Sequence, residues 1–336
     1  MDRLSDYDYD LPEALIAQTP LEDRAASRLL WLNRQGEIEH QDFRAVVDIL
    51  QPGDLLVMND TRVSAVRLFG AKQTGAKVEA FLVRDLGQHR FEALLRPGKR
   101  LKAGSIIEFG DGLTATVEED LGDGLRTLQF KPLSDLHARL AEVGMTPLPP
   151  YIHTVLPDRE RYQTVYGTKA GSAAAPTAGL HFTDEILEAL RAKGVDTATV
   201  TLHVGLDTFR PVQVENLDEH RMHGEACELS EETADKIHQA KGRVIAVGTT
   251  TVRTLEAFAT GPRRVETGVR DTRIFIRPGY KFQVIDGMFT NFHLPKTTML
   301  LMISALMGRE SILAAYHEAV AKRYRFLSFG DSMLLL

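Results

Sequence analysis

Short hydrophobic runs separated by glycine-rich turns fill the chain from about residue 63 to residue 130. Several runs alternate apolar with polar positions, which is the pattern of a strand with one buried face. They predict six strands, at 66–69, 77–83, 91–95, 106–109, 113–117 and 125–130. Short strands at this spacing are typical of a small barrel or sandwich, so a separate β domain is expected here.

The rest of the chain alternates apolar runs with helical patterns. Strands are expected at 55–58, 195–204 and 244–247, and helices at 42–50, 133–143, 184–193, 231–241, 250–258, 298–307 and 309–324, the last two closing the chain. Thr183 and Ser230 stand where helix caps are expected. Strands that alternate with helices indicate an α/β class, a layered α/β/α domain with a largely parallel sheet.

The hydrophobic pattern changes twice, near residue 62 and after the rigid Pro147–Pro150 segment. The β-barrel therefore looks inserted into the other domain. We expect a discontinuous α/β catalytic domain of residues 1–61 and 148–336, with the inserted β-barrel domain at 62–147. A chain of 336 residues is long enough for two such domains.

Composition narrows the setting of the protein. A lone cysteine, Cys227, cannot form an internal disulfide, which argues against an oxidising compartment. The acidic N-terminus is no signal peptide, and the most apolar run, 299–307, is too short to span a bilayer. We expect a cytoplasmic protein with no membrane partner. The net charge of −6 argues against strong non-specific binding of nucleic acid. It does not exclude binding through a local group of basic residues.

A run of small residues, 171–183, leads into the helix at 184. Small residues let a backbone approach a ligand closely, and helix N-termini attract negative groups. Gly171, Ser172, Thr177 and Gly179 are the candidate contacts. The alternative is a flexible surface loop.

A second candidate loop follows the apolar strand at 244–247. Ligands of open α/β sheets lie beyond the carboxyl ends of strands, where Thr249, Thr250 and Arg253 are expected. Backbone N–H groups there could hold a carboxylate with Arg253 as its ion partner. It is no P-loop, because the Gly-Lys-Ser/Thr ending is absent. A helix cap without a ligand is the alternative.

Histidines and carboxylates gather at the ends of predicted elements: His181, His203, His220, His223, Glu225, Asp286 and His293. The spacing of His220, His223 and Glu225 is weak evidence for a metal, and no cysteine pair supports one. A proton-transfer role for some of these side chains is expected. A structural role for each single histidine is the alternative.

A dense basic turn, Arg96-Pro-Gly-Lys-Arg-Leu-Lys102, interrupts the predicted barrel. Charge runs usually form solvated loops. Because small β-barrels often bind nucleic acid, a phosphate-contacting patch is the competing interpretation.

Several segments carry a resemblance that runs through nearly the whole chain in order. They include Asn59-Asp-Thr-Arg-Val63, Arg96-Pro-Gly-Lys-Arg100, Leu148-Pro-Pro-Tyr-Ile152, Arg161-Tyr-Gln-Thr-Val-Tyr166, Gly179-Leu-His-Phe-Thr183, Thr201-Leu-His-Val-Gly205, His220–Glu225, Val247-Gly-Thr-Thr250, Phe275–Tyr280, Thr290–Pro295 and Tyr324–Asp331. Together they resemble the S-adenosylmethionine:tRNA ribosyltransferase-isomerase family of the queuosine pathway. Asp207 departs from the family, which commonly has glycine there.

The resemblance implies an activity. Such enzymes move the ribosyl part of S-adenosylmethionine onto 7-aminomethyl-7-deazaguanine at the wobble position of tRNA and rearrange it, giving epoxyqueuosine with release of adenine and methionine. The partners are S-adenosylmethionine, as co-substrate, and tRNA, through its anticodon stem-loop. The family's fold is an α/β domain with an inserted barrel, without metal or bound cofactor, and we expect a monomer.

The implied reaction assigns hypothetical roles to the candidate residues. Proton transfer falls to His181, His203 and His293, with Asp286 and Glu225 as carboxylate partners or alternate bases. S-adenosylmethionine would contact Gly171, Ser172, Thr177, Gly179, Thr249, Thr250 and Arg253. The RNA phosphates would meet Arg62, Arg96, Lys99 and Arg100, while Tyr166 and Phe182 stack on the splayed-out base.

Other functions compete with this one. A methyltransferase would use the same donor and RNA but would release S-adenosylhomocysteine instead of adenine. A non-catalytic tRNA-binding protein would tolerate loss of the three histidines. A nucleotide-phosphate hydrolase is disfavoured, because the sequence has neither a P-loop nor a metal-ligand cluster.

Overall fold

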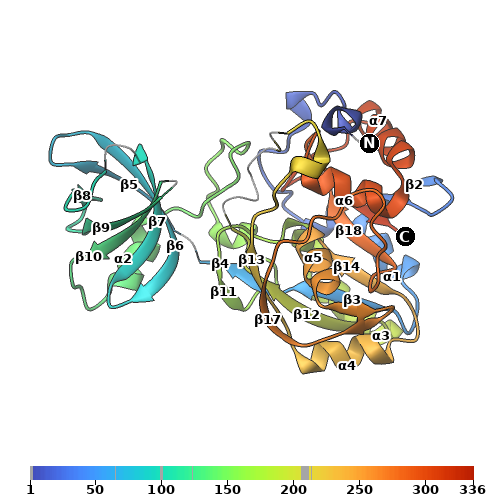
Figure 1. Cartoon of the computed structure of the whole chain (residues 1–336). Helices are drawn as coiled ribbons and strands as arrows, with labels where there is room; N and C mark the ends of the chain where they lie inside the picture. The colour runs from blue at the N-terminus through green and yellow to red at the C-terminus, as the bar shows by residue number, and fades with distance from the viewer. Residues whose placement is uncertain (1–2, 65, 99–100, 123, 206–211, 213) are drawn as a thin grey trace. The chain divides into compact units, whose positions relative to one another are not determined.

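The structure is a computed structural model that describes residues 3–64, 66–98, 101–122, 124–205, 212 and 214–336. The chain divides into two units (Figure 1). Unit 1 comprises Met1–Thr61, Pro149–Lys169 and Ala175–Leu336. Unit 2 comprises Arg62–Leu148 and the short segment Ala170–Ala174. Each unit has its own hydrophobic core.

Unit 1 is built on a mixed sheet, which in the described residues has nine strands in the order β17-β13-β12-β3-β14-β18-β19-β1-β2. Their bounds are β1 Arg28–Leu32, β2 Ile38–Asp42, β3 Leu55–Asn59, β12 Asp196–Leu202, β13 Glu225–Leu229, β14 Val244–Val247, β17 Gly268–Thr272, β18 Gly287–Asn291 and β19 Ser332–Leu335. Neighbours among β12, β3, β14 and β18 pair in parallel. The flanking pairs are antiparallel, except that β1 and β19 are parallel.

Helices cover both faces of the central strands, which confirms the α/β class. Every position of β3 and β14 is buried, as expected for strands with two covered faces. Leu56 and Met58 of β3 share a core cluster with Ile186 and Leu190 of α3 (Asp184–Lys193) and Val46 of α1 (Val46–Ile49). Alternate residues of a strand face opposite ways. The other face therefore meets α5 (Thr249–Ala257), which contacts β3, β12 and β14.

The helix at 184–193 forms with the bounds that its sequence predicts. The Thr183 hydroxyl accepts a hydrogen bond from Ile186 N at 3.3 Å and caps the N-terminus. Gly194, with φ of 92°, ends the helix in the left-handed conformation that glycine adopts without strain. The strand at 244–247 and the helix at 298–307 (α6) also form where predicted.

Several expectations need correction at element ends. The expected helix at 42–50 is a 3₁₀ turn, η4 (Phe43–Ala45), followed by the single turn α1. The helix capped by Ser230, α4 (Glu231–Gln239), ends before Lys241. The final helix, α7 (Arg309–Ala321), does not close the chain, because β19 follows it and joins the sheet between β18 and β1.

Unit 2 contains a closed barrel with the order β10-β7-β6-β5-β8-β9. The six predicted strands are confirmed as β5 (Val66–Lys72), β6 (Lys77–Gly87), β7 (Arg90–Arg96), β8 (Ile106–Glu108), β9 (Thr114–Gly122) and β10 (Leu125–Phe130). Leu68, Val78 and Ala80 alternate with more exposed neighbours and fill the barrel core. The helix α2 (Leu136–Val143) contributes Leu136 and Leu140 to that core.

Short elements complete the described chain. Strand β4 (Thr61–Val63) pairs with β11 (Lys169–Ser172), and β15 (Ala259–Gly261) pairs with β16 (Arg264–Val265). The 3₁₀ turns used below are η3 (Arg24–Ala26) and η7 (Thr177–His181). Across the described residues, no single helix has the length and apolarity to cross a membrane. The pair α6 and α7 meets that test together, with a bend of 115° between its two members.

Candidate active site at the carboxyl edge of the parallel strands

Four parallel strands of unit 1 end at one edge of the sheet. Strands β3, β12, β14 and β18 run in the same direction, so their last residues line up on the side that we call the carboxyl edge. Open α/β sheets bind ligands there. His203 follows β12 directly, and Thr61 and Thr250 lie shortly after the ends of β3 and β14. We therefore place the candidate site at the carboxyl edge.

Asn59, the last residue of β3, ties three strand ends together. Its Oδ1 accepts hydrogen bonds from Thr61 N and Leu202 N, both at 3.1 Å. Its Nδ2 donates to Leu202 O at 3.0 Å and to Thr250 Oγ1 at 3.2 Å. Because Asn59 is fully buried, these bonds hold the residues after β3, β12 and β14 in fixed positions.

His203 presents one defined nitrogen for proton transfer. The Thr61 hydroxyl donates to Lys169 O at 3.3 Å and therefore accepts from Nδ1–H of His203, 3.0 Å away. The lone pair then lies on Nε2. Burial lowers the pKa of His203, while the negative charges of Asp60 and Glu228 oppose that shift. A neutral, half-buried imidazole with a free lone pair suits a general base.

Asp60 is a carboxylate that the candidate list drawn from the sequence left out. It is buried, its Oδ1 accepts from Thr201 Oγ1 at 2.7 Å, and its charge acts on His203. Together with burial, it also raises the pKa of Tyr166, so that phenol keeps its proton at neutral pH. The signal was present in the sequence, because Asp60 comes right after β3, whose first four residues are apolar.

His181 lies at the end of η7 in a buried hydrogen-bond chain. Asn291 Oδ1 accepts from Thr177 Oγ1 at 3.0 Å, so Asn291 Nδ2 faces His181 Nε2 at 3.1 Å and donates to it. The proton of the imidazole is then on Nδ1, which meets Ser27 Oγ at 2.7 Å. Burial, reinforced by Arg325 and Arg24, lowers the pKa of His181 to about 3, so the ring is neutral.

His293 occupies a different environment. Its Nε2 meets Thr290 Oγ1 at 2.7 Å, its main-chain N–H donates to the Tyr316 hydroxyl at 2.9 Å, and its carbonyl accepts from the Tyr9 hydroxyl. Burial lowers the pKa of His293 to about 3. Tyr9 and Tyr316 pack edge to face, 5.0 Å between ring centroids. This packing supports a structural role for His293.

Arg253 and Glu225 form a buried ion pair with each other. Arg253 Nη1 bonds to Glu225 Oε2, and Nη2 donates to Thr272 O at 3.3 Å. The other carboxylate oxygen accepts from Gly205 N at 3.1 Å and lies 3.6 Å from His223 Nε2. Glu225 therefore pairs with one side of the Arg253 guanidinium, while Arg253 Nε is buried without a hydrogen-bond partner among the described residues. The expected contact of Arg253 with a ligand carboxylate stays a prediction. Among the described residues, no cluster of three or more possible metal ligands is found.

The other candidates at the start of α5 remain open to a ligand. Thr249 and Thr250 form the first turn of that helix and are half-buried. Gly248 precedes them with φ of 90°, a conformation that disfavours any residue with a Cβ. It lies against η7, since a Cβ on Gly248 would stand 3.5 Å from Ala178 Cβ. The helix N-terminus and η7 are therefore neighbours.

The run of small residues at 171–183 belongs partly to unit 1 and partly to unit 2. Thr177 and Gly179 belong to η7 in unit 1, whereas Gly171 and Ser172 belong to unit 2. A Cβ on Gly179 would fall 1.9 Å from the Tyr166 hydroxyl oxygen, so glycine is required for this close approach. Tyr166 thus lies directly against the loop that ends in His181.

Phe182 lies in the core, which favours a structural role over the expected stacking on a base. It is fully buried and packs edge to face on Phe43 at 4.9 Å and on Phe289 at 5.6 Å.

The structure describes only two of the four basic residues that were expected to contact RNA phosphates. Arg62 is half-buried in unit 2 and Arg96 is exposed at the end of β7. Lys99, Arg100 and Asp207 lie outside the described residues.

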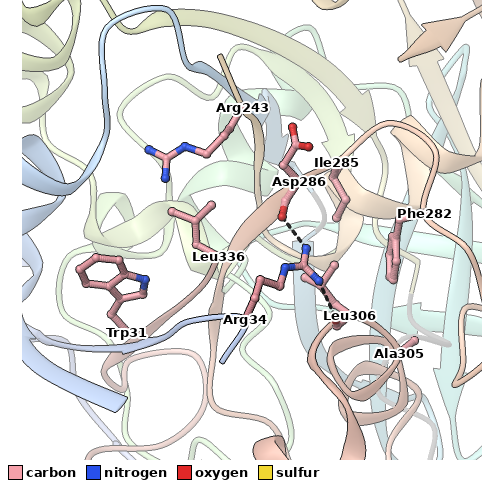
Figure 2. A pocket seen from close by; sticks show the side chains of 9 residues that line it. All are labelled: Trp31, Arg34, Arg243, Phe282, Ile285, Asp286, Ala305, Leu306 and Leu336. Atoms are coloured by element: carbon pink, nitrogen blue, oxygen red, sulfur yellow. Dashed lines mark hydrogen bonds between the residues drawn. The ribbon is translucent and has the colours of Figure 1, made fainter. Parts of the chain in front are cut away.

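Asp286 stands at the opposite edge of the sheet, apart from the histidines. It precedes β18, and its Oδ2 accepts from Val244 N at 2.7 Å at the start of β14. We call this side the amino edge. Asp286 lines a hollow of about 620 Å³ together with Trp31, Arg34 and Arg243. Figure 2 shows these side chains. Arg263 pairs with its carboxylate at 2.6 Å.

Comparisons with known proteins agree along the whole chain. The family of queuosine biosynthesis proteins matches residues 4–335. A relative from Desulforamulus reducens, named S-adenosylmethionine:tRNA ribosyltransferase-isomerase, is 51% identical over 340 residues, covering 99% of this chain and 100% of the relative. A crystal structure of S-adenosylmethionine tRNA ribosyltransferase from Thermotoga maritima is 38% identical, with a TM-score of 0.57 over 98% of this chain and 100% of that one. With a match of this extent, the chain belongs to the queuosine biosynthesis protein family.

Proposed function

We propose that this protein transfers the ribosyl part of S-adenosylmethionine to 7-aminomethyl-7-deazaguanine at the wobble position of tRNA and isomerises it. Adenine and methionine are released, and the tRNA carries epoxyqueuosine. The observation that carries the proposal is the 51% identity, over 99% of the chain, to a relative named for ribosyl transfer and isomerisation. The polar carboxyl edge of unit 1 supports it.

The reaction requires several proton transfers. The sulfonium of the donor acidifies the C5′ hydrogens, departing adenine is easier to release when protonated, and the aminomethyl group must lose a proton to become a nucleophile. His203, neutral and with its lone pair on Nε2, is our choice for the base. His181 and Asp60 are the further proton-handling candidates. We assign Glu225 to positioning Arg253, and His293 to the fold.

The donor would lie against the start of α5 and η7. Its methionyl carboxylate suits the free N–H groups of the first turn of α5, beside Thr249 and Thr250. Thr177 and Gly179 supply a close, uncharged wall. Asp286 takes no part in this arrangement, because it lies at the amino edge.

The RNA partner is a proposal that rests on the family. A wobble base lies in a single-stranded loop and can be splayed out onto an aromatic side chain, for which Tyr166 is the candidate. Arg62, Arg96, Lys99 and Arg100 are the proposed phosphate contacts. S-adenosylmethionine is consumed as co-substrate. The cytoplasmic location and the monomeric state stay predictions.

The decisive experiment uses the full chain, S-adenosylmethionine and an anticodon stem-loop RNA carrying 7-aminomethyl-7-deazaguanine. Mass spectrometry is expected to find adenine and methionine, with the RNA gaining one ribosyl-derived unit. The matched control RNA has guanine at the same position and lacks the nucleophile, so its mass must not change. Release of S-adenosylhomocysteine with a methylated RNA would instead identify a methyltransferase and end the proposal.

A further inference from the structure

A small hollow in unit 1 opens beside His181 on the side away from Asn291. Its volume is about 30 Å³, and Arg24, Arg161, Ser27 and Ser328 contribute to its wall. A cavity needs roughly 10–15 Å³ to hold one water. The hollow therefore accommodates a group of a few atoms, such as one anionic group of a larger molecule, and is too small for a nucleoside.

Three guanidinium groups near this hollow are bound by neutral carbonyl groups. Arg24 donates to Gln163 O at 2.7 Å and to Glu160 O at 2.8 Å. Arg161 donates to Leu21 O, and Arg325 donates to Thr19 O. A main-chain carbonyl orients a guanidinium without neutralising it, so these arginines keep their positive charge.

The cations also crowd one another. Burial and the charge of Arg161 lower the pKa of Arg24, against the weaker opposing pull of Asp158 and Glu160. Burial likewise lowers the pKa of Arg325, although Asp331 opposes the shift. A lowered arginine pKa means that the charged form is disfavoured in this place. An anion in the hollow would relieve that cost.

One donor in this cluster has no partner in the described residues. Arg325 Nη1 is buried and makes no hydrogen bond there. Buried donors are nearly always satisfied, and an unsatisfied one calls for an explanation such as a ligand. Arg325 is not part of the wall of the hollow, but it donates to the carbonyl of Thr19, which precedes the lining residue Pro20. The free donor and the hollow thus belong to one neighbourhood.

We propose that this hollow, formed by Arg24, Arg161, Ser27 and Ser328 with Arg325 beside it, binds a phosphate group of the RNA backbone next to the nucleotide that reacts. Two guanidiniums in the wall, with a third beside it, match the several acceptor oxygens of a phosphate and exceed what one carboxylate needs. A chain with net charge −6 needs local cationic sites to hold RNA. This inference rests on the proposed function for the identity of the RNA.

His181 connects the hollow to the carboxyl edge. Its Nδ1 bonds to Ser27 in the hollow, and its Nε2 bonds to Asn291, the last residue of β18. A phosphate held in the hollow is therefore one imidazole ring away from the strand ends. This places the backbone of the RNA within reach of the proposed reaction site.

The test measures binding of the full chain to the anticodon stem-loop RNA in the absence of S-adenosylmethionine, over a series of salt concentrations. Arg161→Gln and Arg325→Gln are each expected to weaken affinity about tenfold and to reduce the slope of log affinity against log salt by about 0.7–0.9. Arg161→Lys keeps the charge and should retain the slope. Arg264→Gln, an exposed arginine beside the Arg263–Asp286 pair, is the matched control and should change neither quantity.

Melting curves establish that each variant folds, and if one glutamine variant does not fold, the other carries the test. Glutamine variants with unchanged RNA affinity and slope overturn the proposal. A raised KM for S-adenosylmethionine with unchanged RNA affinity also overturns it, because the hollow would then hold the donor's carboxylate. Failure of the proposed function appears separately, as absence of adenine release by the unaltered protein.

Discussion

The carboxyl edge and the amino edge of the same sheet hold their polar side chains in different ways. At the carboxyl edge, Asn59, Thr61 and Asn291 bond to neutral groups, including two imidazoles, and the buried Arg253–Glu225 ion pair is the exception. At the amino edge, Asp54 binds Arg243 through both carboxylate oxygens, and Asp286 pairs with Arg263.

The difference suggests that the two edges of one sheet have different tasks, with proton transfer at the carboxyl edge and stabilisation of the fold at the amino edge. Neutral hydrogen-bond chains fix the orientation and tautomer of a histidine while leaving it free to exchange a proton. Hydrogen bonds from main-chain N–H groups and ion pairs with arginines instead hold a carboxylate in its charged form, as the lowered pKa of Asp54 shows. We therefore expect substitutions at the two edges to have opposite effects on turnover and on folding.

The largest effect is expected from a matched pair of substitutions, His203→Ala and Asp286→Asn. Loss of the proposed base should lower kcat by about 100-fold or more. Asp286→Asn keeps an acceptor for Val244 N but loses the charge opposite Arg263, so it should lower the free energy of unfolding by about 1–2 kcal/mol and leave kcat nearly unchanged. Single-turnover kinetics and urea unfolding measure the two quantities. Equal losses of kcat in both variants would abolish the distinction between the edges.

The next effect concerns pH. Folded His181 and His293 have a pKa of about 3 against an ordinary 6.5. Between these values the unfolded chain binds protons that the folded chain does not, so stability falls as the pH falls below 6.5. The expected slope is about 1.4 kcal/mol per pH unit for each histidine. Asp54 behaves differently, since its lowered pKa makes its contribution disappear only below about 3.8.

Urea unfolding at several pH values between 5 and 7 checks this prediction. His293→Gln should remove about one histidine's share of the slope. Stability that stays flat from pH 6.5 down to pH 5 would mean that the two buried histidines are protonated in the folded protein.

The smallest effect is expected from a comparison of two glycines that both have a positive φ. Gly53 and Gly248 have φ of 89° and 90°. In both places an added Cβ would have only ordinary contacts, 3.7 Å from Gly242 N and 3.5 Å from Ala178 Cβ. Because an L side chain is disfavoured at positive φ, each change to alanine should destabilise by about 1–3 kcal/mol. Only Gly248→Ala should also raise the KM for S-adenosylmethionine, because it precedes α5. A similar KM in both variants would argue against a donor site at that helix.

Local signals explain why much of the fold was predictable. The barrel strands are bounded by glycines, and α3 carries both its Thr183 cap and its Gly194 stop, so nearby residues define these elements. Strands β1, β18 and β19 lack such signals. Their pairing joins distant segments, as with Leu29 and Ser332, and a short buried strand is hard to distinguish from a buried helix by periodicity.

The strands that were not predicted also explain how the candidate site residues were grouped from the sequence. The rule that ligands lie beyond strand ends predicted the region of Thr249 and Thr250 from the visible strand at 244–247. Because β18 was not predicted, Asp286 and His293 were grouped together, although they lie at its opposite ends. The ion pair of Arg253 and Glu225 joins two elements that are distant in sequence, so no local sequence pattern could predict it.

The place of β19 in the sheet has a consequence for biogenesis. Arg28 and Asp331, which are hydrogen-bonded, are 303 residues apart in the chain, and β19 is the strand that connects β1 to the rest of the sheet. During synthesis, the hairpin of β1 and β2 is made first and must wait for nearly the whole chain before it can join the sheet. Leu29, Leu30 and Leu32 stay without their final neighbours during that time. The nascent chain therefore carries an apolar, pairing-competent edge that needs protection from aggregation until the last strand emerges.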